Sequence, residues 1–118
     1  MKIIDSHQHF WDPSRGDYFW MPKDNKILNR KYNLEDLVKD STSIDLYKTV
    51  LVQAAATNAE TEYMLNIAEN SELVSGVVGW VNFEDPNQLE QLKLFAKNPK
   101  FVGVRPMIQD IPDENWVL

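Results

Sequence analysis

Two histidines near the N-terminus are the residues whose type and spacing point most directly to chemistry. His7 and His9 are two positions apart, and they are the only histidines in the 118-residue chain. They follow Ile3 and Ile4, whose apolar side chains predict that a β-strand runs into this stretch. Because side chains alternate between the faces of a strand, both imidazoles are expected to point the same way. Imidazole is a preferred ligand of zinc and similar divalent ions, so the pair predicts part of a metal site.

A second interpretation of the same pattern is a strand whose histidines are ordinary surface or core residues. Under the metal interpretation, Asp5 lies behind the pair and would orient one imidazole. The chain has no cysteine and no other histidine, so any further protein ligand from it must be an oxygen.

The composition describes an acidic chain of ordinary hydrophobicity. Hydrophobic residues make up 43% and charged residues 25%, and the formal net charge is −6. That charge argues against nucleic acid or an anionic membrane as the main partner, because both favour clustered Lys and Arg. We see no apolar run typical of a signal peptide or a membrane span. Because the chain lacks cysteine, it forms no disulfides, and we expect a cytoplasmic protein.

Apolar stretches that predict strands alternate with segments that predict helices. The helix signals are a cap at Asn33, a Thr57 and Glu60 capping box, and a cap at Asp85 followed by Pro86. Strand, helix, strand order predicts βαβ units and a parallel sheet. The strands are expected near residues 2–9, 47–55, 74–81 and 101–106.

Residues 10–32 show no regular period and are predicted to form one long loop. Loops of this length are usually functional when they are ordered. Trp11 and Trp20 are candidates for a lid or pocket wall. The alternative is a surface insertion in which these aromatic side chains only pack.

The predicted sheet is expected to be half of a closed barrel. A doubly wound sheet usually carries a glycine-rich turn after its first strand, and none is present here. A (β/α)8 barrel, the TIM barrel, needs about 250 residues, whereas this chain provides four strands and three intervening helices. We therefore predict a single α/β domain over residues 1–118, incomplete, corresponding to the N-terminal half of a (β/α)8 barrel. A homodimer closing the barrel and a self-contained small α/β domain are the alternatives.

Four segments, in order and at plausible spacing, carry a family resemblance: IDSHQHFWD, TVLVQAA, GVVGWV and VGVRPMIQD. Together they resemble the amidohydrolase superfamily, and within it the branch of sugar-acid lactonases of the L-fuconolactonase and L-rhamnonolactonase type. The resemblance implies a TIM barrel, a site at the carboxyl ends of the strands and hydrolysis of a lactone. It also implies a divalent metal, with zinc as the expected ion, and further ligands after later strands that this sequence does not contain.

The strand ends supply the candidate site residues, since the carboxyl ends of parallel barrel strands gather on one face. His7 and His9 are the predicted metal ligands. Arg105 and Gln53 are the predicted catalytic residues, the first holding a carboxylate or oxyanion through its planar donors and the second a sugar hydroxyl. Trp80 is predicted, together with Trp11 and Trp20, to contact the substrate, and a packing role is the alternative for all three.

The leading functional hypothesis is a metal-assisted hydrolase that opens a sugar-acid lactone, with this chain as an inactive part of it. A decarboxylase of the same superfamily is one alternative. A non-catalytic half-barrel that needs a partner is the other. The expected partner is a small-molecule substrate in each enzymatic case.

Overall fold

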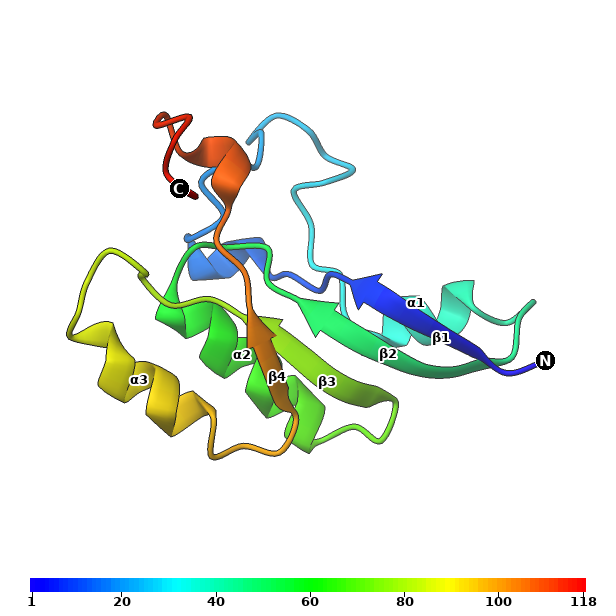
Figure 1. Ribbon diagram of the computed structural model, residues 1–118. Helices are drawn as coiled ribbons and strands as arrows, with labels where there is room; N and C mark the ends of the chain where they lie inside the picture. Colours follow the sequence, from blue (N-terminus) through cyan, green and yellow to red (C-terminus); the bar gives the residue numbers. More distant parts are fainter.

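Four parallel strands form one sheet in the order in which they occur in the chain (Figure 1). The computed structural model describes residues 1–118. Each strand ends before the limit expected from the sequence, so the candidate site residues follow the strands, except for His7, which lies inside the first strand. The strands are β1 (Ile3–Gln8), β2 (Leu46–Val52), β3 (Val74–Gly79) and β4 (Phe101–Val104).

Three helices connect the strands and bury one face of the sheet, as the alternating pattern predicts. They are α1 (Leu34–Asp40), α2 (Asn58–Glu69) and α3 (Gln88–Phe95). The first two lie behind the sheet in Figure 1. The core between the sheet and the helices consists of Phe10, Leu51, Met64, Leu65, Ala68, Val74, Val77, Val81 and Phe95.

The helix caps agree with the sequence signals at α1, in part at α2 and not at α3. Asn33 and Asp36 form a complete capping box at α1. At α2, Thr57 accepts a hydrogen bond from the Glu60 N–H, but the Glu60 carboxylate turns to other partners. The cap expected at Asp85 is wrong, because its carboxylate accepts from the next turn residues and α3 begins three positions later, at Gln88.

Helix α2 and strand β3 approach each other at Gly79. A Cβ atom at this position would lie 2.6 Å from the Thr61 methyl carbon, so only glycine fits. The Thr61 hydroxyl donates to the Trp80 carbonyl and accepts from the Trp80 N–H, both at 2.8 Å. These contacts set the direction in which the chain leaves β3.

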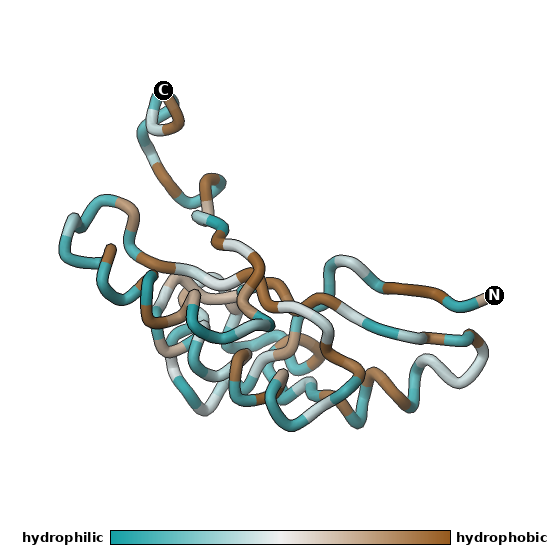
Figure 2. The backbone as a smooth tube through the Cα atoms, turned by 60° about the horizontal axis from the view of Figure 1, so that its bottom comes forward, coloured by the Kyte–Doolittle hydropathy of each residue, from teal (hydrophilic) through white to brown (hydrophobic).

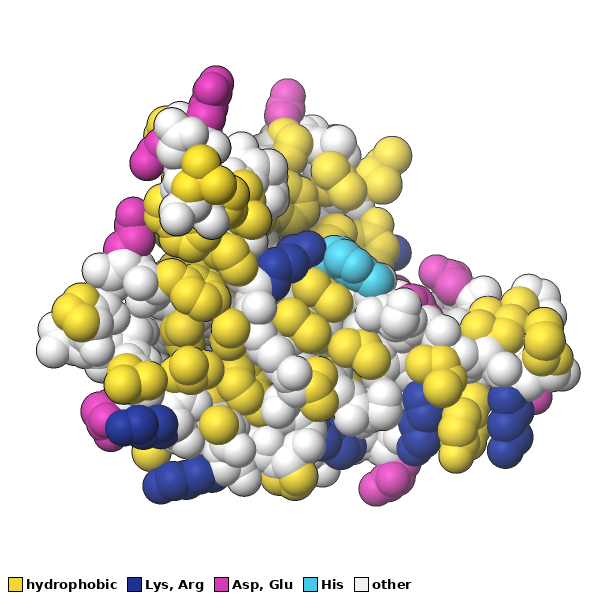
Figure 3. Space-filling view, viewed as in Figure 1, with side chains coloured by type: hydrophobic (Ala, Val, Ile, Leu, Met, Phe, Trp, Pro, Cys, Tyr) yellow, Lys and Arg dark blue, Asp and Glu magenta, His cyan; other side chains and the backbone are white.

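The second face of the sheet is open in this chain. Figure 3, which shares the view of Figure 1, shows hydrophobic side chains across it. Val102 in β4 is 59% exposed although it lies against Gly76 of the neighbouring strand. The Cα radius of gyration is 15.2 Å, whereas a compact domain of this length would have about 13.5 Å. The molecule therefore has a sheet layer and a helix layer, with no third layer.

The long loop predicted over residues 10–32 is ordered and folds onto the carboxyl end of the sheet. Its ends pair through two backbone hydrogen bonds between Trp11 and Tyr32. It contains a 3-10 turn, Pro13–Arg15, capped by Asp12. A second small core, separate from the main one, joins it to the segment after β2 and consists of Tyr18, Met21, Ala54 and Ala55.

The segment after β4 contains a second 3-10 turn, Ile108–Asp110. Figure 2 shows this C-terminal segment reaching away from the strands and helices. Trp116 packs edge-on against Phe83, and its indole donates to Glu84. None of the helices combines the length and apolarity that crossing a membrane requires.

Candidate active site

The two histidines converge at the carboxyl end of β1. Their Nε2 atoms lie 3.2 Å apart, with the rings at 72° to each other. Asp5 accepts a hydrogen bond from the His7 backbone N–H at 3.0 Å, so this carboxylate binds the backbone within β1, and the orienting of an imidazole suggested for it stays a prediction. The strand periodicity therefore predicted correctly that both imidazoles face the same side.

The environment of His9 keeps its imidazole in the form that binds metals. Its Nδ1 lies 2.8 Å from the Val52 carbonyl, which can only accept, so Nδ1 carries the proton and Nε2 is left with its lone pair. Burial lowers the pKa of His9 and outweighs the opposing effect of the hydrogen bond to Val52, and the charge of Arg105 lowers it further. A neutral ring with a free Nε2 fits a divalent ion, and this donor set suits zinc.

Arg105 and Gln53 bind each other across the end of β3. The Arg105 guanidinium donates to the Gln53 carbonyl at 2.7 Å, and the Gln53 side-chain amide donates to the Arg105 carbonyl at 2.9 Å. Burial lowers the pKa of Arg105. Gln53 is fully buried by these contacts. The pair therefore holds the ends of β2 and β4 together.

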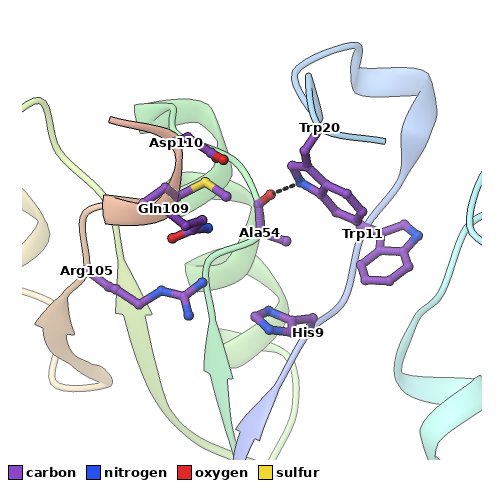
Figure 4. A pocket seen from close by; sticks show the side chains of 8 residues that line it. His9, Trp11, Trp20, Ala54, Arg105, Gln109 and Asp110 are labelled. Carbon is purple, nitrogen blue, oxygen red and sulfur yellow. Dashed lines mark hydrogen bonds between the residues drawn. The ribbon is translucent and has the colours of Figure 1, made fainter. Parts of the chain in front are cut away.

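A pocket of about 410 Å³ opens at the carboxyl ends of the strands. In Figure 4, Arg105 and Gln109 lie on one side of it and Trp20 and Trp11 on the other, with His9 at its base. The Trp20 indole donates to the Ala54 carbonyl at 2.5 Å, and the two tryptophan rings meet edge to face. The lining residues are His9, Trp11, Trp20, Ala54, Arg105, Met107, Gln109 and Asp110.

The structure brings together most, but not all, of the residues that the sequence singled out. His9, Arg105, Trp11 and Trp20 line the pocket, and His7 lies against His9 outside its lining. Gln53 lies buried and does not line it, so the catalytic role suggested for this residue stays a prediction.

Trp80 lines a neighbouring pocket of about 220 Å³ instead. Met107 and Asp110 belong to the linings of both pockets, so the two adjoin. The predicted substrate contact of Trp80 also stays a prediction.

Four pocket residues were missed by sequence reasoning: Ala54 after β2, and three residues after β4. Met107, Gln109 and Asp110 follow β4, in a stretch without helix or strand periodicity. The one available signal was their position directly after a predicted strand end, in the segment VGVRPMIQD.

The family is decided by comparison with known proteins. The model of a family described as amidohydrolase matches residues 4–117. The chain belongs to the amidohydrolase family. This confirms the superfamily resemblance of the sequence segments.

Curated relatives of this amidohydrolase chain include two L-fucono-1,5-lactonases. The protein from Burkholderia ambifaria is 35% identical over 114 residues, which are 97% of this chain and 39% of the relative. The protein from Burkholderia multivorans is 33% identical and is matched over 93% of this chain and 37% of its own length. The chain thus spans about two fifths of the length of the curated relatives it matches.

Solved structures show the same fold. An amidohydrolase from Burkholderia multivorans with bound zinc superposes with a TM-score of 0.82 at 34% identity, over 93% of this chain and 38% of the other. Amidohydrolase 2 from Bifidobacterium longum subsp. infantis superposes with a TM-score of 0.58 at 20% identity, over 92% of this chain and 54% of the other, and shows the fold alone. The four strands and their helices have the architecture of the N-terminal half of a (β/α)8 barrel, as predicted.

The amidohydrolase chain gathers two imidazoles that could bind a metal ion. No group of three or more His, Asp or Glu side chains that could hold a metal occurs in it. His7 and His9 are the side chains whose converging Nε2 atoms could hold a metal ion, with the Val52 carbonyl orienting the second ring. The solved structure of the Burkholderia multivorans amidohydrolase contains bound zinc, which agrees with a divalent ion for the family.

Proposed function

We propose that this chain forms the first half of the active site of a metal-dependent lactonase that hydrolyses a sugar-acid 1,5-lactone. The observation that carries the proposal is the convergence of the His7 and His9 Nε2 atoms, 3.2 Å apart, beside a pocket that also contains Arg105. The L-fucono-1,5-lactonases among the relatives support this substrate class.

The pocket offers a matched surface for a polyhydroxylated ring. Trp11 and Trp20 present aromatic faces and edges to the apolar side of a sugar. Gln109 and Asp110 supply an amide and a carboxylate for hydroxyl groups. Arg105, whose position is braced by Gln53, faces the same space and would hold the carbonyl oxygen as negative charge develops on it.

A divalent ion held by His7 and His9 would supply Lewis-acid polarisation of the lactone carbonyl. Catalytic zinc sites in proteins use three protein ligands, and this chain gathers two. We therefore propose that turnover needs strands beyond these four, and we expect the 118-residue chain alone to be inactive.

The test is hydrolysis of L-fucono-1,5-lactone by a complete barrel that carries this sequence. The acid that hydrolysis releases is measured with a pH indicator in weak buffer. We expect zinc-dependent turnover. We also expect that replacing both His7 and His9 by alanine lowers zinc content and turnover together, by at least about a hundredfold in turnover. The control is Glu90→Gln, which alters an exposed carboxylate on α3 that pairs only with Lys93.

Two results would reject the proposal. Unchanged zinc content in the double variant would show that these imidazoles are not ligands. Release of carbon dioxide from an acid substrate, with no lactone turnover, would assign the site to the decarboxylase alternative instead.

A further inference from the structure

A buried carboxylate at the start of α2 joins three separate segments of the chain. Glu60 is fully buried. One of its oxygens accepts from the Ala54 N–H at 2.9 Å, in the segment after β2. The other accepts from the Arg15 guanidinium at 2.8 Å and from the Tyr18 hydroxyl at 3.2 Å, both in the long loop. A glutamate at this helix position would ordinarily accept a hydrogen bond from the backbone of its own N-cap residue. Here its carboxylate instead forms tertiary contacts with other segments of the chain.

The loop side of this contact is itself held in several ways. Arg15 donates to the Asp17 carboxylate at 2.5 Å, and that carboxylate also accepts from the Thr57 hydroxyl at 2.6 Å. The guanidinium lies over the Tyr63 ring of α2 at 4.6 Å. Burial raises the pKa of Tyr18, so its hydroxyl keeps the proton that it donates to Glu60. A buried charge with this many partners is costly to leave unpaired.

Ala54 connects the carboxylate to the pocket. Its N–H is bound by Glu60, and its carbonyl accepts from the Trp20 indole at 2.5 Å. Trp20 in turn packs against Trp11, and both rings line the pocket opposite Arg105 (Figure 4). The same peptide segment is thus held on one side by the carboxylate and on the other by the indole.

We propose that Glu60 is a positioning residue for the pocket wall: it clamps the long loop onto the segment after β2 and so sets the place of Trp20. It does not touch the pocket itself and acts through Ala54, Arg15 and Tyr18. This inference rests on the proposed function only in treating the pocket as a substrate site.

The test follows hydrogen exchange of the tryptophan indole protons by NMR in the 15N-labelled 118-residue chain. In Glu60→Gln, we expect the Trp20 indole proton to exchange at least about tenfold faster, because the loop opens locally from Ala54. The Trp11 indole donates to the Leu28 and Arg30 carbonyls inside the loop, so its exchange should change by less than about twofold. This readout does not depend on lactone hydrolysis, so its outcome is separate from that of the proposed function.

Two further variants complete the test. Glu62→Gln changes an exposed carboxylate two positions along α2 and should leave all indole exchange rates unchanged. Arg15→Gln removes the cation that pairs with Glu60, and the Arg15 side chain is 18% exposed. This variant should speed exchange of the Trp20 indole proton selectively, and it keeps the test possible if Glu60→Gln does not fold. The proposal would be overturned if hydrogen exchange became faster to the same extent at every tryptophan indole. It would also be overturned if the Trp20 indole proton exchanged no faster in the folded Glu60→Gln or Arg15→Gln variants.

Discussion

At the scale of single residues, the side chains that line the pocket also form hydrogen bonds to backbone carbonyls. The His9 ring is oriented by a carbonyl of β2, and Trp20 is oriented by the carbonyl of Ala54. Arg105 is oriented by the carbonyl of Gln53. Backbone acceptors of this kind restrict each ring or guanidinium to one orientation, which is what a preorganised site requires.

The bonds of Gln53 predict a structural effect that its suggested catalytic role does not. Gln53→Leu should lower the free energy of unfolding by about 1–3 kcal/mol, because the half-buried Arg105 carbonyl would lose the donor that the buried Gln53 supplies. Urea unfolding followed by circular dichroism measures the change. Gln109→Leu, at an exposed residue of the pocket rim, is the control and should change it by less than about 0.5 kcal/mol. Equal effects of the two substitutions would contradict this account of Gln53.

At the scale of elements, the capping box of α1 predicts a pH dependence. The hydrogen bond from the Asn33 N–H, and next to it that from Arg30, lower the pKa of Asp36 below its usual 3.8. A carboxylate whose pKa is depressed by folding stabilises the folded state above its unfolded pKa. That contribution is lost as the pH falls through the folded pKa.

Asp36→Asn should therefore be less stable than the native chain at pH 7, and the difference should shrink as the pH falls from about 5 to about 3. Urea unfolding at a series of pH values measures it. Glu35→Gln, in the same helical turn but with an exposed carboxylate that accepts no hydrogen bond, should show a smaller difference at pH 7. A gap between native and Asp36→Asn that is constant with pH would be inconsistent with the capping box.

The sequence was informative about elements wherever local signals and burial agreed. The strand order, three helices and the Asn33 cap followed from apolar periodicity and capping residues. Asp85 and Glu60 carried equally good local signals, yet Asp85 closes a turn and Glu60 bonds a loop more than forty positions away. Local patterns cannot distinguish such uses, because the competing partners come from distant parts of the chain.

The candidate site was predictable where strand ends define it and at the two loop tryptophans, Trp11 and Trp20. His7, His9 and Arg105 were found because parallel strands gather their carboxyl ends. Beyond a strand, alternation no longer says where a side chain points, which is why Gln53 was expected in the pocket and lies buried beside it. For the same reason Gln109 and Asp110, on an irregular turn, were not singled out.

At the scale of the whole molecule, one face of the sheet is buried and the other is open. Val77 is fully buried in the main core, whereas Val102 is 59% exposed on the neighbouring strand. In the 118-residue chain, Val77→Ala should cost about 1.5–3 kcal/mol of unfolding free energy, and Val102→Ala less than about 0.5 kcal/mol. Thermal and urea unfolding measure both.

In a complete barrel the same Val102→Ala change should become costly, because further strands would bury that face. A comparison of the two backgrounds thus tests the half-barrel architecture. Equal, small effects of Val102→Ala in both would mean that nothing covers the face.

The bond pair between Gln53 and Arg105 has a consequence for variation in related chains. Strands β2 and β4 are not neighbours in the sheet. The two hydrogen bonds between Gln53 and Arg105 therefore connect the ends of these strands across the end of β3, beside the pocket. Insertions or deletions in the connection through α3 can then be absorbed at the amino-terminal side of β4 without moving the guanidinium. We expect homologues to differ in length there while keeping the arginine and its glutamine in register.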